Sequence, residues 1–200
     1  MIIKGLEKTV GDFKLYIDEL YLEPGKIHGL VGHNGAGKSI LLKLMMGIME
    51  PDAGSIDYEG LDIKEVTLMP QTPYLLHTSV YENIVFPLKL RGIQPDETEI
   101  DRLLEMAGLS EQKNQYALSL SSGEKQKLSF LRAVVFKPKL ILMDETLSNL
   151  DPESEAAIIE MIKNTQADQK ATWVIVSHQL ENKKGLCDEI HHMSKGAMMD

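Results

Sequence analysis

The sequence is short of cysteine, of tryptophan and of clustered positive charge. Its 200 residues include a single cysteine, Cys187, so no internal disulfide can form and a reducing compartment is favoured. Lysine and arginine together number 21 against 30 acidic residues, which gives a formal net charge of −9, and no basic run stands out. Nucleic-acid binding requires clustered positive charge, so we expect no nucleic-acid partner.

Segments that would carry the chain across a membrane are also missing from the sequence. A membrane-spanning helix needs roughly 20 consecutive apolar residues. The chain has no such run and no charged-then-apolar secretory start. We therefore expect a cytoplasmic protein that cannot cross a membrane unaided. Its length suits one domain with a sizeable core, and no internal repeat or low-complexity linker is visible.

A glycine-rich segment follows the apolar run 27–31 and matches the phosphate-loop pattern G-x-x-x-x-G-K-[ST]. Glycines allow backbone N–H groups to approach phosphate oxygens, and the helix expected next directs its positive dipole end at them. Lys38 would reach the β- and γ-phosphates, and Ser39 would offer its hydroxyl to Mg²⁺. The segment therefore predicts binding of a nucleoside triphosphate with Mg²⁺. The predicted contact residues are Gly32, His33, Asn34, Gly35, Ala36, Gly37, Lys38, Ser39 and Ile40.

The patterning of apolar residues predicts an α/β fold. Residues 2–22 have the character of short antiparallel strands joined by a turn at Gly11–Asp12. Residues 79–137 show helical periodicity and are interpreted as an α-helical insertion. The apolar runs 140–143 and 173–176, separated by a helix, are typical of a buried parallel sheet.

Two carboxylates, Asp144 and Glu145, directly follow the apolar run 140–143. Ligands of parallel sheets bind at the C-terminal ends of the strands, so both side chains are expected at a ligand site. Asp144 is expected to hold Mg²⁺, and Glu145 to polarise the water that attacks the γ-phosphate. Phosphoryl transfer depends on this positioning and charge neutralisation. The alternative, a pair of exposed carboxylates, becomes weak once a phosphate loop stands upstream.

The order of these motifs resembles the ATP-binding cassette (ABC) ATPases over almost the whole chain. The discriminating segment is 120–124, Leu-Ser-Ser-Gly-Glu, which resembles the ABC signature motif and begins a predicted helix. A serine and a glycine at a helix start form an anion site, although a lone serine there would be read as an N-cap. The resemblance implies that Ser121, Gly123 and Glu124 meet the γ-phosphate held by a second copy of the chain in a head-to-tail dimer.

The resemblance extends to further single positions. Gln71 is similar to the glutamine that senses Mg²⁺ and the attacking water, so the implied metal-contacting residues are Ser39, Gln71 and Asp144. Asp151, in the segment 148–151, is similar to the D-loop aspartate at the dimer interface. His178 is similar to the switch histidine that contacts the γ-phosphate. The implied catalytic residues are Glu145, His178, Lys38 and Gln71.

By contrast, His191 and His192 are expected to be surface residues rather than a metal site, because the sequence shows no second ligand cluster beside them.

The expected architecture is a P-loop NTPase core with a mostly parallel sheet, an N-terminal antiparallel β subdomain and an inserted α-helical subdomain. We expect one domain spanning 1–200, with the core and antiparallel part at 1–78 and 138–200 and the helical insertion at 79–137.

Some positions depart from the family pattern. Ser122 stands where glycine is usual and Glu124 where glutamine is usual, which adds bulk and charge near the partner's phosphate and is expected to weaken or retune dimerisation. Ile40 replaces a frequent threonine and removes one hydrogen bond of about 1 kcal/mol net. Thr146 replaces a frequent proline. An aromatic residue that stacks on adenine is missing near Val10, and the candidates to replace it are Phe13 and Tyr16, so strict preference for adenine stays open.

The resemblance implies an ATPase that binds ATP and Mg²⁺, dimerises on ATP and drives transport through a separate integral membrane subunit. The protein would then lie on the cytoplasmic face of the membrane, with segment 71–90 lining the groove that receives the membrane subunit. The alternative for the apolar character of this segment is ordinary packing of the helical insertion onto the core. An inorganic ion is the expected substrate, with the direction of transport left open. The alternatives are a soluble ABC ATPase of the repair or translation type, or a regulatory nucleotide binder that does not hydrolyse ATP.

Overall fold

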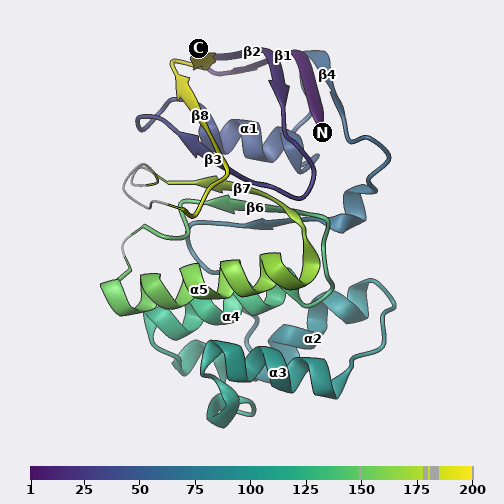
Figure 1. Ribbon diagram of the computed structural model, residues 1–200, viewed down its shortest axis with the longest axis vertical. Coiled ribbons are helices and arrows are strands. Elements are labelled where there is room, and N and C mark those ends of the chain that lie inside the picture. The colour runs from purple at the N-terminus through teal and green to yellow at the C-terminus, as the bar shows by residue number, and fades with distance from the viewer. Residues whose placement is uncertain (149, 178–179, 181–184, 200) are drawn as a thin grey trace. The chain divides into compact units, whose positions relative to one another are not determined.

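The computed structural model describes residues 1–148, 150–177, 180 and 185–199, and its contacts group the chain into two compact units (Figure 1). The sheet unit comprises residues 1–68, 139–145 and 170–200, and the helical unit comprises residues 69–138 and 146–169. The second unit thus includes residues on both sides of the expected insertion. The domain boundaries drawn from the sequence stay a prediction.

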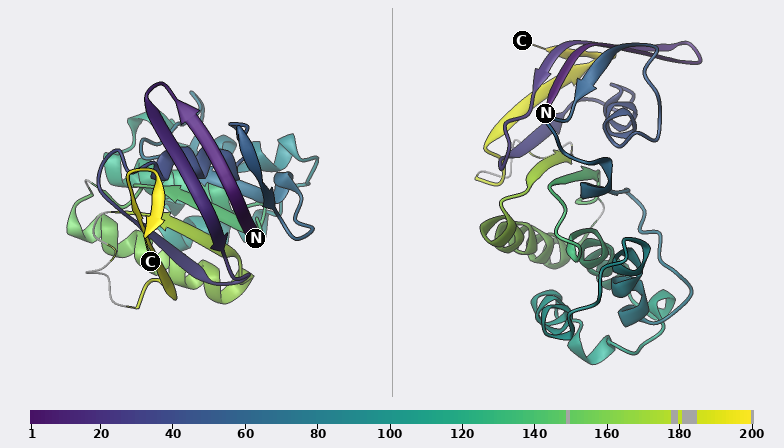
Figure 2. Two further views of the ribbon diagram at one scale, coloured as in Figure 1. Left: turned by 90° about the horizontal axis from the view of Figure 1, so that it is seen from above. Right: turned by 90° about the vertical axis from the view of Figure 1, so that its right-hand side faces the viewer.

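An antiparallel sheet opens the sheet unit, as expected from the sequence. Strands β1 (Ile2–Val10) and β2 (Phe13–Tyr21) form a hairpin, seen from above in Figure 2, and β4 (Ala53–Asp57) pairs with the other edge of β1. The turn contains Gly11 at φ 58°, in the left-handed region that glycine enters without strain. Inward residues such as Ile3 and Ile17 are fully buried, which fixes the register of the hairpin.

A six-stranded sheet forms the other layer of the sheet unit. Strands β3, β6, β7 and β8 run parallel to one another, and β9 returns antiparallel to β8. All five residues of β3 are buried, as is Trp173 of β7, which explains the apolar runs in the sequence. The strand order is β5 (Val66–Met69), β6 (Leu140–Asp144), β7 (Thr172–Val176), β3 (Ile27–Val31), β8 (Glu189–Ser194) and β9 (Ala197–Met199).

Among the described residues, an apolar core joins the two layers of the sheet unit. Helix α1 (Lys38–Met45) contributes Leu41 and Leu42, which are fully buried, and β1 and β2 contribute their inward faces. The short 3₁₀ helix Ile63–Glu65 leads into β5, and a capping box between Asp62 and Glu65 caps its N-terminus. The phosphate loop runs from β3 to α1. Because both elements pack on this core, both ends of the loop are held in place.

The helical unit is a bundle in which α4 is central. Helix α4 (Ser122–Val134) packs against α2 (Val80–Leu90), α3 (Glu97–Ala107) and α5 (Pro152–Gln169). Side chains of Ser79, Asp96 and Ser121 cap α2, α3 and α4 by accepting backbone N–H bonds, which satisfies groups that a helix start leaves unpaired. The remaining short helices are Ser110–Gln112 and Ala117–Ser119.

Asn83 organises the segment before α2. Its fully buried amide accepts from the backbone N–H of Leu76 at 2.8 Å and donates to the carbonyls of Leu76 and Ser79 at 3.2 and 2.9 Å. These bonds satisfy a buried polar side chain and hold the loop in one conformation. Among the described residues, no helix combines the length and apolar character needed to span a membrane.

Candidate functional site

The phosphate-loop segment lies between β3 and α1 in a conformation that only small residues allow. Gly37, at φ 104°, is the N-cap of α1, and Gly35 adopts φ 77°. A Cβ atom at Gly32 would lie 2.2 Å from the backbone carbonyl oxygen of Met193, so a larger residue would displace the loop or β8. The start of α1 therefore faces the loop with unpaired N–H groups, the arrangement that favours an anion.

Lys38 is buried beneath this loop, where its side chain bonds backbone carbonyl groups. Its side chain is 4 % exposed, and its Nζ donates to the carbonyl oxygens of Gly32 at 2.6 Å and His33 at 3.0 Å. Burial lowers the pKa of Lys38, while the carboxylates of Glu145 and Asp144 oppose that shift. A phosphate group beside the ammonium would supply the negative charge that stabilises its protonated form.

Ser39 and Asp144 bring a hydroxyl and a carboxylate together from α1 and β6. The Ser39 hydroxyl donates to Asp144 Oδ1 at 3.0 Å. Octahedral Mg²⁺, with bonds of about 2.1 Å at right angles, holds neighbouring oxygen ligands about 3.0 Å apart, so this pair fits two adjacent ligand positions. Burial raises the pKa of Asp144, the bond from Ser39 lowers it, and nearby Glu145 raises it further.

Glu145 follows β6 at a sharp change in backbone direction. Its φ is 50°, in the left-handed region, and its N–H donates to the carbonyl of Val176 at 3.0 Å. The carboxylate is 19 % exposed and lies 3.9 Å from Lys38 Nζ. A strained, non-glycine residue beside a buried ammonium is a pattern found at functional sites, because the surrounding structure must hold it there.

Ser121 and Glu124 form a capping box at the start of α4. The Glu124 carboxylate accepts from the Ser121 N–H at 2.8 Å, and the Ser121 hydroxyl accepts from the Glu124 N–H at 3.3 Å. Hydrogen bonds from the backbone N–H and the side chain of Ser121 to the carboxylate lower the pKa of Glu124. The glutamate that departs from the family pattern is therefore an ionised cap of this helix. Its carboxylate accepts the Ser121 N–H, one of the groups that a helix start leaves unpaired.

Gly123 is buried where α4 meets the segment that starts α5. A Cβ atom at this position would lie 2.3 Å from Ser154 Oγ and 3.9 Å from Asp151 Oδ2. Asp151 accepts from the backbone N–H groups of Glu153 and Ser154 at 3.1 and 2.9 Å, which fixes the chain around Ser154. Glycine at 123 thus permits close packing between the predicted signature and D-loop segments.

We predict that Gly123→Ala lowers the free energy of unfolding by about 1–3 kcal/mol, the usual effect of overpacking. In an open helix the same change would instead raise stability by up to about 1 kcal/mol. Urea denaturation followed by circular dichroism measures the difference. The double variant Gly123→Ala/Ser154→Gly removes the clashing side chain and should regain stability. A Gly123→Ala protein as stable as the wild type would contradict this packing.

Two polar contacts, the first of them buried, connect α4 to loops of the helical unit. Gln126, 3 % exposed, donates from Nε2 to the Thr146 carbonyl at 2.9 Å. Arg132 donates from its guanidinium to the carbonyl of Tyr74, in the segment that follows Gln71. Gln71 itself is exposed in the helical unit. Movement of either loop would therefore be transmitted to α4.

The structure brings part of the predicted site together. Lys38, Ser39, Asp144 and Glu145 converge in the sheet unit. The implied residues of the helical unit are Gln71, Ser121, Gly123, Glu124 and Asp151. His178 lies outside the described residues, as does position 149 of the predicted D-loop.

Of the two aromatic candidates for base stacking, Phe13 lies beside the phosphate loop. A Cβ atom at Gly37 would be 2.9 Å from the Phe13 ring. Tyr16 is 48 % exposed, and its hydroxyl bonds Asp18 at 3.2 Å. Phe13 is therefore the better placed to meet a nucleotide base. The close approach of the Met193 carbonyl to Gly32 was not predicted from the sequence, because it depends on the pairing of β8 with β3.

Comparison with known proteins agrees with this geometry. The family model described as ABC transporter matches residues 17–148, more than half of the chain. The chain belongs to the ABC transporter family. Members of this family that carry the ATP-binding role are ATPases, and the α/β fold with its antiparallel N-terminal sheet is the ABC ATPase fold.

Individual ABC relatives cover nearly all of the chain. The tungstate uptake system ATP-binding protein TupC of Peptoclostridium acidaminophilum is 36 % identical over 201 residues, 97 % of this chain and 94 % of that protein. The methionine import ATP-binding protein MetN 1 of Listeria monocytogenes is 33 % identical over 90 % of this chain, which spans only 57 % of that longer relative.

Solved structures share the fold along the full chain. The ATP-binding subunit of an ABC transporter aligns with a TM-score of 0.86 and 26 % identity, covering 100 % of this chain and 88 % of that one. The cbiO1 protein of Clostridium perfringens, part of the ABC transporter complex cbiONQ, aligns with a TM-score of 0.85 and 23 % identity, covering 86 % of its own chain. The second likeness bears on the fold alone.

Proposed function

We propose that this chain is the ATP-hydrolysing subunit of a membrane importer for an inorganic oxyanion. The observation that carries the proposal is the likeness to the tungstate uptake protein, which extends over 97 % of this chain at 36 % identity. Binding of ATP would place the triphosphate on the phosphate loop, with Phe13 beside the base. The ABC family membership supports the ATPase activity.

In this proposal, hydrolysis depends on four groups of the sheet unit. Lys38 binds the β- and γ-phosphates, and Glu145 accepts the developing proton of the attacking water. Ser39 and Asp144 would hold Mg²⁺, which neutralises phosphate charge when bound. The 3.9 Å separation between Lys38 Nζ and the Glu145 carboxylate supports the proposal that both act at one site. Gln71 and His178 would complete it around the γ-phosphate.

A second copy of the chain would complete the anion site. Each nucleotide would lie between the phosphate loop of one copy and the start of α4 of the other, where the Ser121 hydroxyl and the backbone at Gly123 meet the γ-phosphate. The Glu124 carboxylate sits at this helix start and adds a negative charge there. We therefore expect a weaker ATP-driven dimer than a glutamine at 124 would give.

The surface proposed for the membrane subunit lies on the helical unit. Tyr74 is 81 % exposed and Leu90 is 68 % exposed. Arg132 holds the Tyr74 carbonyl, while the Arg91 guanidinium lies 3.6 Å from the centre of the Phe136 ring. Tyr74 therefore contacts the last turn of α4, and the end of α2 contacts Phe136 just beyond that helix.

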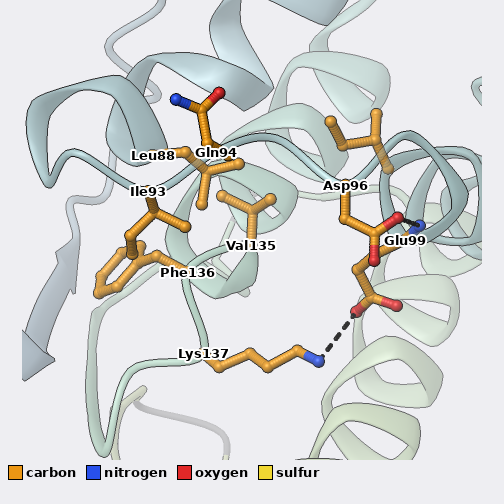
Figure 3. Close-up of a pocket in the computed structure, with 9 residues that line it drawn as sticks. Leu88, Ile93, Gln94, Asp96, Glu99, Val135, Phe136 and Lys137 are labelled. Carbon is orange, nitrogen blue, oxygen red and sulfur yellow. Dashed lines mark hydrogen bonds and ion pairs between the residues drawn. The ribbon is translucent and has the colours of Figure 1, made fainter.

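A pocket of about 170 Å³ lies between the ends of α2 and α4 and the start of α3. Figure 3 shows apolar side chains such as Phe136 on one side and Asp96, Glu99 and Lys137 on the other, with Lys137 reaching toward Glu99. A pocket that is apolar on one side and charged on the other suits a protruding segment of a membrane protein. The full lining is Leu88, Ile93, Gln94, Asp96, Glu99, Ile100, Val135, Phe136 and Lys137.

The apolar segment expected to dock the membrane subunit divides into two groups. Leu75, Val80 and Ile84 are buried in the helical unit, so their apolar character serves ordinary packing. Tyr74 and Leu90 are the members of the segment with large exposed apolar side chains among the described residues. The proposed docking surface is thus smaller than the sequence indicated and centred on the end of α2.

The test is to replace Leu90 by glutamate in the native host and to recover the protein from membranes with MgATP. We expect Leu90→Glu to lose its multi-span membrane partner and the uptake of tungstate while retaining ATP hydrolysis in solution. Ile48→Glu is the matched control, because Ile48 is 64 % exposed in the sheet unit, close to the 68 % of Leu90.

Other results of this experiment would change the proposal. Recovery of only soluble partners by the wild type would favour a soluble ABC ATPase. Membrane recovery without ATP turnover would favour a regulatory nucleotide binder. Loss of methionine uptake with unchanged tungstate uptake would move the substrate to the class named in the second relative.

A further inference from the structure

Two histidines and a glutamate meet on one face of the β3–β8 pair, at the end of β3 away from the phosphate loop. In this parallel pair His28 lies opposite Glu189, and Leu30 lies opposite His191. Because successive strand residues alternate between faces, all these side chains lie on the same side of the sheet. The pairing of the two strands is visible in Figure 1. The ligand atoms of His28, Glu189 and His191 all lie within 4.8 Å of one another.

The surroundings of His28 fix which of its nitrogens faces the cluster. The residue is fully buried, and its Nε2 lies 3.0 Å from the carbonyl oxygen of Glu23. A carbonyl can only accept, so Nε2 carries the hydrogen and Nδ1 of the neutral ring carries a lone pair. That lone pair points toward His191 Nε2, 3.1 Å away, and Glu189 Oε2, 3.4 Å away.

A histidine that binds metal through one nitrogen almost always donates its other N–H to a carbonyl or carboxylate, as His28 does to Glu23. Glu189 is similarly oriented: its Oε1 accepts from Lys26 Nζ at 3.1 Å, which leaves Oε2 toward the histidines. These outer contacts hold the three donor atoms on rigid strands, as a metal site requires.

The separations between the donor atoms match a tetrahedral ion. Bonds of about 2.0–2.2 Å in a tetrahedral zinc site place neighbouring ligand atoms about 3.3–3.6 Å apart. The observed separations are 3.1 Å between His28 and His191, 3.4 Å between His28 and Glu189, and 3.9 Å between His191 and Glu189. Small side-chain adjustments would therefore admit an ion.

We propose that His28, His191 and Glu189 form a binding site for one divalent transition-metal ion of the zinc class, with water as the fourth ligand. Two imidazoles and one carboxylate suit Zn²⁺ or Co²⁺ and disfavour Mg²⁺, which prefers an all-oxygen octahedron. On binding, the hydrogen that joins His191 Nε2 to His28 Nδ1 would move to the other nitrogen of His191. The ion would fasten β8 to β3. His191, expected to be a surface residue, is only 19 % exposed because β8 places it against His28.

The experiment uses the full chain, without a histidine tag or nucleotide, in excess Mg²⁺ to occupy oxygen-rich sites. Isothermal titration with Zn²⁺ should give one bound ion per chain, and Co²⁺ should give the absorption bands of a tetrahedral complex. Bound metal should raise the melting temperature, since the unfolded chain lacks the site. His191→Ala and Glu189→Gln should each weaken zinc binding at least about tenfold, since even the loss of an outer partner commonly has this effect.

Three control variants separate the cluster from other metal donors. His192 is exposed on the opposite face of β8, His77 lies in the helical unit, and Cys187 approaches Gly29 on the face that also carries Ile190. His192→Ala, His77→Ala and Cys187→Ser should retain wild-type zinc affinity. Absence of stoichiometric binding by the wild type would overturn the proposal and leave a hydrogen-bonded pair of histidines. Equal losses in His191→Ala and His192→Ala would overturn it as well.

Discussion

Glu145→Gln is expected to lower the rate of ATP hydrolysis about 100- to 10,000-fold, the range over which a positioned general base acts. The amide keeps the size of the side chain but cannot accept the proton of the attacking water. The phosphate-binding groups, Lys38 above all, are unchanged, so the affinity for ATP should stay within a few-fold. Phosphate release at saturating MgATP measures the rate, and titration with a fluorescent ATP analogue measures binding.

The same variant tests the proposed dimer. With hydrolysis blocked and nucleotide bound, Glu145→Gln should accumulate as a dimer in MgATP and be a monomer in its absence, which sedimentation velocity resolves. The control is Glu160→Gln, an identical chemical change at an exposed position of α5. A Glu145→Gln protein that hydrolyses ATP at the wild-type rate would remove this residue from catalysis. One that stays monomeric in MgATP would count against the ATP-driven dimer.

Asp144→Asn is expected to abolish magnesium-dependent hydrolysis while making the nucleotide-free protein at least as stable as the wild type. Burial raises the pKa of Asp144 above its value in the unfolded chain. Below the unfolded value both states are protonated and the carboxyl carries no penalty. As the pH rises through the raised folded value, the native state must ionise a partly buried group, and stability is lost. Asparagine removes this loss at neutral pH and keeps an acceptor for Ser39.

Chemical denaturation at pH 4 to 8, covering the ordinary carboxyl range of about 4 and neutrality, checks this prediction. The stability advantage of Asp144→Asn over the wild type should grow as the pH rises through this range in the absence of Mg²⁺, and excess MgATP should stabilise the wild type more than the variant. Asp12→Asn, in the exposed turn between β1 and β2, is the matched control. A variant that is clearly less stable than the wild type at neutral pH without Mg²⁺ would refute the electrostatic argument.

The sequence predicted those parts of the molecule that depend on neighbouring residues. The phosphate loop, its helix and the carboxylates after β6 follow from local spacing, and the antiparallel opening follows from short-range alternation around Gly11. The predicted α/β fold class, with a mostly parallel sheet and an N-terminal antiparallel sheet, is confirmed. The roles of Glu145 and the other site residues stay predictions that the variants above test.

Features that depend on contacts between distant segments were not predicted. His191 is half-buried because β8 pairs with β3, and nothing near it in sequence indicates His28 as a neighbour. Glu124 was expected to be an added charge, whereas its carboxylate also caps α4 through Ser121. The burial of Val80 arises from packing in the helical unit, which a hydropathy pattern cannot distinguish from a docking surface.

Trp173 is the one tryptophan of the chain and lies in β7, opposite Ile27 at the start of β3. Its emission therefore reports on β7 of the sheet unit, while most of the far-ultraviolet helical signal comes from α2, α3, α4 and α5 in the other unit. Fluorescence and circular dichroism thus observe different parts of the same chain. Superimposable melting curves would mean that the two units unfold as one cooperative block. Separated curves would give each unit its own transition. Repeating the melts with nucleotide would then show which unit the nucleotide stabilises.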